Sequence, residues 1–201
     1  MVQAVIFDAF GTLVRITRPT HPYRQLLALG VAQGRPVHAE DRQLLMGQPL
    51  GLEQAAQRLG IELSSAQLAA LQVALDDELE SIELWPDTQP ALDWLQAHGF
   101  SLALCSNLAL PYGEPLTRLF GSLQGQFFSY EQGCLKPDPE LYRRCCRQLG
   151  VPAADCVMIG DSPECDRDGP AAAGWRGYLL GRLGKPGDYP DLLSFARALS
   201  P

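Results

Sequence analysis

The chain has 201 residues, 46% of them hydrophobic and 19% charged, so it can bury a core of its own as one domain with a modest insertion. Its 23 acidic residues outnumber its 16 basic ones, and the formal net charge of −7 disfavours binding to nucleic acid or to an anionic membrane surface. No leader-like segment precedes the first strand-like run, and no apolar stretch is long enough to cross a bilayer. We therefore expect a cytoplasmic protein.

The six cysteines show neither CxxC spacing nor a Cys/His pattern that would bind zinc. Several lie within apolar runs, where reduced cysteine behaves as a small core residue. We expect them to be reduced and to serve packing.

Strands and helices are predicted to alternate over most of the chain. The first element is a strand over residues 2–7, which ends at Asp8. After residue 86, the pattern predicts helices over 88–97, 110–119, 139–149 and 192–199, a short helix that closes at 170–173, and strands over 100–105, 127–130, 156–159 and 175–180. Strands separated by helices of about ten residues favour right-handed crossovers. The sequence therefore predicts an α/β fold with a Rossmann-like parallel sheet.

Residues 15–85 have a different character. Apolar residues recur there at helical spacing over 23–29, 40–46, 52–59 and 66–84, with glycine and proline between the segments. This pattern predicts a small all-helical domain inserted after the first strand. The α/β core then comprises residues 1–14 and 86–201.

Polar side chains follow four of the predicted strands or strand-like segments, where open α/β sheets place their ligand sites. These residues are Asp8, the pair Ser106 and Asn107, Lys136, and Asp161 followed by Asp166 and Asp168. Each of the four groups supplies a different chemical type.

This set is complete enough for phosphoryl transfer, which needs a nucleophile, hydrogen-bond donors, a cation and often a metal. Asp8 can supply the nucleophile, and Ser106, Asn107 and Lys136 the donors. Asp8 and Asp161 together can form a site for Mg²⁺, which prefers oxygen ligands.

In these four motifs, and in their order along nearly the whole chain, the sequence resembles the haloacid dehalogenase superfamily of hydrolases. The resemblance implies that residues 15–85 form a cap that closes over the site. It implies that Asp8 is the covalent nucleophile and that Ser106 and Lys136 hold the phosphate, with Thr12 and Asn107 in the same phosphate-binding set. By the same resemblance Asp161 binds Mg²⁺, and Asp166 orients the residues around the metal. The motif spacing favours Asp166 over Asp168 for this role.

One position departs from the pattern of the family's phosphatases. They usually carry a second aspartate two residues after the nucleophile, as general acid and base, and here that residue is Phe10. The Phe10 carbonyl can still bind the metal, but its side chain cannot transfer a proton. Since a positioned acid or base contributes about a hundred- to ten-thousandfold in rate, an ordinary alkyl phosphate should be a slow substrate.

Other members of the family also lack this aspartate. The metal-free dehalogenases have a first motif much like residues 8–12 but replace the metal-binding acids, which this chain keeps. The phosphonoacetaldehyde hydrolases need a cap lysine for a Schiff base, and no lysine precedes Lys136.

Three readings remain open: a weakened Mg²⁺-dependent phosphohydrolase of a small phosphorylated molecule, a catalytically impaired protein that binds a phosphorylated ligand or partner, and a 2-haloacid dehalogenase. The residues of the insertion that could replace the missing acid are His21, Tyr23, His38 and Glu40.

Overall fold

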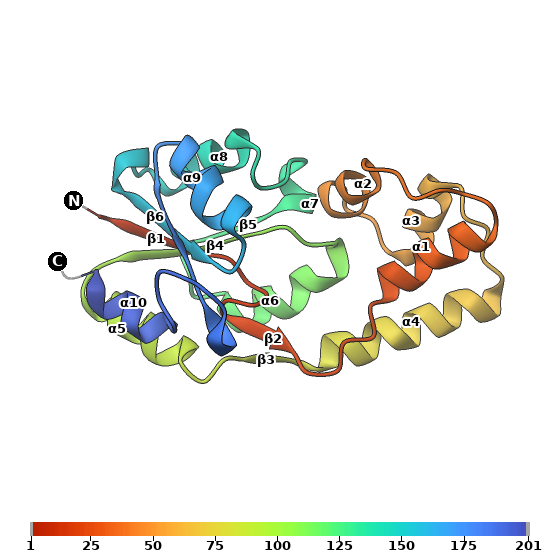
Figure 1. The fold of residues 1–201 in the computed structure, drawn as a ribbon, viewed down its shortest axis with the longest axis horizontal. Coiled ribbons are helices and arrows are strands. Elements are labelled where there is room, and N and C mark those ends of the chain that lie inside the picture. Colours follow the sequence, from red (N-terminus) through yellow and green to blue (C-terminus); the bar gives the residue numbers. More distant parts are fainter. Residues whose placement is uncertain (1, 200–201) are drawn as a thin grey trace.

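The structure is a computed structural model and describes residues 2–199. Five parallel strands form the central sheet in the order β5-β4-β1-β6-β7 (Figure 1). Phe7 of β1 lies beside Leu104 of β4 and Ile159 of β6, so the three central strands end together. The predicted α/β fold with a parallel sheet is confirmed. The bounds of the strands are β1 Ala4–Phe7, β4 Ser101–Ser106, β5 Gly125–Phe128, β6 Cys156–Gly160 and β7 Arg176–Leu179.

Helices cover both faces of this sheet. Along β1, Val5 and Phe7 face one layer while Ala4 and Ile6 face the other, as the two-residue period of a strand requires. The first layer is formed by α5 (Thr88–Ala97), α6 (Gly113–Phe120) and α10 (Leu192–Ala198), and the second by α8 (Pro139–Leu149) with the short α9 (Gly169–Ala172) beside it. Because both faces are buried, the strands are apolar throughout rather than alternating.

A helical segment is inserted between two further strands. Strand β2 (Val14–Ile16) pairs antiparallel with β3 (Ile82–Leu84), and the chain between them forms α1 (Pro22–Ala32), α2 (Asp41–Gly47), α3 (Leu52–Leu59) and α4 (Ser65–Glu80). We call residues 17–81 the helical insertion. It has its own apolar core around Leu26, Leu59 and Leu75, and it lies beyond the end of the sheet at which β1 stops (Figure 1). Within residues 2–199, no helix is both long enough and apolar enough to span a membrane.

The structure differs from the predicted elements at several boundaries. The helix predicted over 66–84 ends at Glu80, because residues 82–84 pair with β2, a tertiary contact that local periodicity does not reveal. The strand predicted over 127–130 ends at Phe128, and α7 (Ser129–Gln132) follows it. The helix predicted over 110–119 is a 3₁₀ turn (Leu110–Tyr112) followed by α6. Residues 1, 200 and 201, at the outer bounds of the predicted core, lie outside the described residues.

A charged pair fixes the connection from α1 to α2. The Arg35 guanidinium donates to both carboxylate oxygens of Asp41, at 2.8 and 2.5 Å, and the backbone N–H of His38 donates to the same carboxylate at 2.9 Å. These contacts lower the pKa of Asp41 to about 2, with the Arg35 hydrogen bonds as the main cause. The pair thus ties the first residue of α2 to the loop that follows α1.

We expect Asp41→Asn to lower the free energy of unfolding by about 1–2 kcal/mol, because hydrogen bonds to charged groups contribute about 1.5–3 kcal/mol and the partial exposure of Arg35 screens this pair. Since the pKa is depressed in the folded state, the contribution of Asp41 is complete above its unfolded pKa of about 4 and is lost as the pH falls towards 2. Urea titrations at several pH values measure this, with the exposed Asp77→Asn on α4 as the matched control. Equal losses in the two variants would contradict the assignment.

Candidate active site

Three of the predicted site residues meet where the central strands end. Asp8 directly follows β1, Ser106 is the last residue of β4, and Asp161 directly follows β6. Since β1 lies between β4 and β6 in a parallel sheet, these side chains converge at one edge. The Ser106 hydroxyl donates to Asp8 Oδ1 at 3.0 Å, which helps to fix the rotation of that carboxylate.

Lys136 lies at the centre of a buried ionic network. Its Nζ is 2.8 Å from Asp8 Oδ1 and 2.6 Å from Asp166 Oδ1, and only 2% of the Lys136 surface is exposed. Burial alone would lower the pKa of Lys136, but Asp166 and Asp8 raise it well above its usual value. Burial raises the pKa of Asp166 to about 6 even though Lys136 opposes that shift. Lys136 is therefore a firmly charged cation that touches the predicted nucleophile.

Backbone contacts hold this network in position. The Asn107 side chain donates to the Lys136 carbonyl and accepts from the Lys136 N–H, both at 2.8 Å. The backbone N–H of Ser162 donates to Asp166 Oδ2 at 3.0 Å. Asn107, which was predicted to bind phosphate, thus positions the backbone of Lys136, and one N–H of its amide is not used by these two hydrogen bonds.

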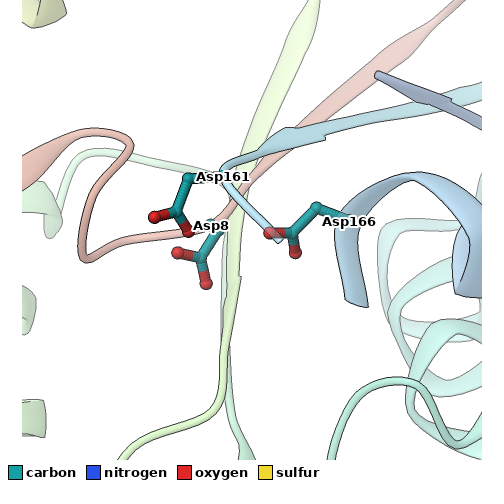
Figure 2. Close-up of side chains that lie close together, drawn as sticks. All are labelled: Asp8, Asp161 and Asp166. Carbon is teal, nitrogen blue, oxygen red and sulfur yellow. The ribbon is translucent and has the colours of Figure 1, made fainter. Parts of the chain in front are cut away.

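The carboxyl groups of Asp8, Asp161 and Asp166 gather around one point, with oxygen atoms that all lie within 4.8 Å of one another (Figure 2). An all-oxygen donor set of this kind fits Mg²⁺. Both oxygens of Asp166 accept hydrogen bonds, from Lys136 and from the Ser162 N–H. Burial and the nearby Asp8 carboxylate raise the pKa of Asp161, and a bound cation would lower that pKa again.

Gly11 allows the loop after β1 to pass close to Asp161. Its φ is +81°, and a Cβ there would lie 2.4 Å from Asp161 Oδ2. A side chain at this position would therefore meet both backbone strain and the carboxylate.

The three aspartates, Ser106 and Lys136 line a cavity of about 160 Å³, which we call the Asp8 cavity. It includes three residues that the sequence analysis did not single out as site residues: Arg42 on α2, Ser162 and Cys165. No spacing or motif distinguishes Arg42 from the other thirteen arginines, since only the packing of the helical insertion brings it here. The lining comprises Asp8, Phe10, Arg42, Ser106, Asn107, Lys136, Asp161, Ser162, Cys165 and Asp166.

Thr12, predicted to bind phosphate, does not line this cavity. Its side chain is fully buried, and Oγ1 has no hydrogen-bond partner among residues 2–199. Its carbonyl accepts two hydrogen bonds from Arg182, at 2.5 and 3.1 Å. The tight turn over residues 9–14, in which three N–H groups donate to the Ala9 carbonyl, directs Thr12 into the core instead.

The four residues considered as replacements for the missing acid separate in the structure. His21 and Tyr23 line a second cavity of about 440 Å³, which shares Phe10 and Asn107 with the Asp8 cavity. His38 and Glu40 line neither of these two cavities.

Residues 2–174 match the family model of haloacid dehalogenase-like hydrolases. The chain belongs to this family. It is therefore a hydrolase, as the motifs around Asp8 and Lys136 predicted.

Relatives with different activities align over most of the chain. The glyceraldehyde 3-phosphate phosphatase of Methanopyrus kandleri is 27% identical, over 96% of this chain and 88% of its own length. The (S)-2-haloacid dehalogenase 1 of Pseudomonas sp. strain CBS-3 is also 27% identical, over 94% and 88%. The crystal structure of a HAD phosphatase from Thermococcus onnurineus superposes with a TM-score of 0.65 at 22% identity and covers 98% of both chains, which supports the fold.

We expect Lys136→Met to lower the free energy of unfolding by about 3–5 kcal/mol near neutral pH, because it leaves two buried carboxylates without their counter-charge. Burial already raises the folded-state pKa of Asp166 to about 6, and without the lysine it lies further above the unfolded value of about 3.9, so the loss shrinks as the pH falls towards 4. Denaturant titrations across this pH range measure the effect. The exposed Arg58→Met on α3 is the control, and a loss independent of pH would contradict the network.

Proposed function

We propose that the chain is a Mg²⁺-dependent phosphohydrolase that acts on a small phosphorylated molecule through an aspartyl-phosphate on Asp8. The observation that carries the proposal is the position of Asp8 in a small cavity, in contact with Lys136 and Ser106 and beside Asp161. The phosphatase among the relatives supports the same reaction class.

In the first step, a carboxylate oxygen of Asp8 attacks the phosphorus atom. The bond from phosphorus to the leaving-group oxygen breaks, and that oxygen keeps the electron pair. Water then attacks the acyl phosphate, so that inorganic phosphate departs and the Asp8 carboxylate is restored. Lys136 and Ser106 neutralise and hold the phosphoryl oxygens, and Asn107 keeps Lys136 in place.

Asp8 and Asp161 would hold Mg²⁺, together with the carbonyl of Phe10, which also lines the cavity. When bound, the ion would supply positive charge against the phosphoryl oxygens. Asp166 accepts hydrogen bonds from Lys136 and from the Ser162 N–H, so it would orient the site rather than bind the ion directly. Arg42 adds a second cation to the wall, suited to an anionic substrate.

Phe10 limits the reaction to leaving groups that depart without a proton from this position. We expect Asp8→Asn to abolish Mg²⁺-dependent release of phosphate from 4-nitrophenyl phosphate. Phe10→Asp should raise turnover of an alkyl phosphate by about a hundredfold or more, because it restores a group that can transfer a proton.

Phe10→Asn is the matched control for Phe10→Asp, since the asparagine side chain has nearly the same shape as that of aspartate but carries no titratable proton. Steady-state kinetics on the alkyl and aryl esters test both statements. Turnover that survives Asp8→Asn would overturn the role of Asp8, and equal gains in both Phe10 variants would show that the missing acid was not the limit.

Substitutions at two glycines distinguish an effect on metal binding from an effect of backbone strain. Gly11→Ala and Gly34→Ala both force a side chain onto a left-handed backbone, at φ +81° and +88°, and each should cost about 1–2 kcal/mol of stability. Only the change at Gly11 displaces Asp161, because the space around Gly34 is open. We expect calorimetric titration with Mg²⁺ to show at least about tenfold weaker binding for Gly11→Ala alone, roughly the loss of one good hydrogen bond. Unchanged affinity would remove Asp161 from the proposed site.

A second candidate function is dehalogenation of a 2-haloacid, in which Asp8 displaces halide from carbon. Phe10 and the relative from Pseudomonas favour it. The presence of Asp161 beside Asp8 favours the phosphohydrolase. Halide release from a 2-haloacid without Mg²⁺ would decide for the dehalogenase, and Mg²⁺-dependent, Asp8-dependent phosphate release would decide against it. Phosphate binding without either activity would favour the third reading, a catalytically impaired protein that binds a phosphorylated ligand or partner.

A further inference from the structure

The second cavity, of about 440 Å³, lies against the Asp8 cavity and is formed by the core and the helical insertion together. Nine of its thirteen lining residues are apolar or aromatic, among them Tyr23, Leu45 and Met46 from the insertion and Phe10, Leu108 and Tyr112 from the core. We call it the apolar chamber. Its volume falls within the range of about 300–1,000 Å³ that is typical of small-molecule sites.

Aromatic rings form one wall of the chamber. The ring of Phe10 meets that of Tyr112 edge to face, with centroids 5.7 Å apart and an interplanar angle of 87°. The ring centroid of Tyr23 lies 6.4 Å from that of Tyr112, with an interplanar angle of 41°. Edge-to-face and offset contacts are the arrangements that aromatic groups prefer, so this wall suits a flat aromatic ligand.

A buried carboxylate holds this wall in place. Glu78 on α4 accepts a hydrogen bond from the Tyr112 hydroxyl at 2.7 Å and from the backbone N–H groups of Thr20 and His21 at 2.7 and 2.6 Å. Burial would raise the pKa of Glu78, but these hydrogen bonds lower it below its usual value. The chamber wall therefore carries an anchored carboxylate, and Arg24 from the helical insertion adds a cation to the same lining.

Phe10 belongs to both cavities and joins their chemistry. On the side of Asp8 it provides no proton for the leaving group. On the side of the chamber it provides apolar surface. A phenolate is a good leaving group without protonation, because phenolic hydroxyls have pKa values of only about 10. The chamber thus accepts the class of leaving group that the lack of an acid requires.

We propose that the substrate is an aryl phosphate whose apolar aromatic portion, of one or two rings, occupies the chamber while its phosphoryl group occupies the Asp8 cavity. This proposal rests on the proposed phosphohydrolase function. When Asp8 attacks, the bond from phosphorus to the aryl oxygen breaks, the electron pair stays on the phenolate, and solvent water supplies its proton.

The binding test uses Asp8→Asn protein with Mg²⁺, so that the esters are not turned over. We expect 2-naphthyl phosphate to bind at least about tenfold more tightly than methyl phosphate, because it buries apolar area worth roughly 25 cal/mol per Å². Both affinities are measured at a pH at which the two esters carry the same charge on phosphate. Agreement within about threefold would overturn the proposal.

A chamber variant locates the effect. Ala109 lines the chamber and is 4% exposed, so Ala109→Phe should fill it. We expect the ratio of kcat/KM for 2-naphthyl phosphate to that for acetyl phosphate to fall at least about tenfold. Val73→Phe, which adds a similar ring at a position 62% exposed on α4, is the matched control and should leave the ratio unchanged. Tyr112→Leu against Tyr112→Phe gives an independent comparison if Ala109→Phe does not fold.

The two proposals fail in different ways. Asp8-dependent hydrolysis of acetyl phosphate, with no preference for aryl esters, would overturn the aryl substrate and leave the phosphohydrolase in place. Tight binding of 2-naphthyl phosphate by the unaltered protein, with no Asp8-dependent release of phosphate, would keep the occupant of the chamber and overturn the phosphohydrolase.

Discussion

The buried contact of Lys136 with Asp8 and Asp166 is the constraint on which the rest of the site depends. An ammonium group that is only 2% exposed must have counter-charges, and the two carboxylates supply them at hydrogen-bond distance. With Asp161 added, three carboxylates share the cavity with Lys136 and Arg42, so the cavity retains an excess of one negative charge. That excess fits a divalent cation, which in turn prepares the site for an anionic substrate.

Small details of the backbone serve this network. Gly11 and Gly160 lack the Cβ atoms that would collide with Asp161 and Asp166, at 2.4 and 2.2 Å from their carboxylate oxygens. Asn107 fixes the lysine backbone. The site is therefore held by hydrogen bonds from rigid strand ends, which is the way that precise geometry is maintained in catalytic sites.

The helical insertion adds what the strand ends do not provide. Arg42 comes to the Asp8 cavity from α2, and the apolar chamber exists only where the insertion meets the core. Two contacts join these parts beside the chamber: Tyr112 donates to Glu78 at 2.7 Å, and the Ser129 hydroxyl donates to the carbonyl of Met46 at 2.6 Å. The fold thus separates a polar cavity for the reacting group from an apolar one for the remainder of the ligand.

The sequence by itself determined the α/β class, the parallel sheet, and the residues that follow its central strands, because apolar periodicity and strand-end placement are local properties. Asp8, Ser106 and Asp161 could be named for that reason, whereas Lys136 follows α7 rather than a strand. Only the tertiary structure decided that Thr12 turns into the core, that Asn107 binds the backbone of Lys136, and that Arg42 and Glu78 enter the two cavities. A buried Glu78 looks like any exposed acid on a helix until the partners of its carboxylate are known, and those partners lie up to 58 residues away along the chain.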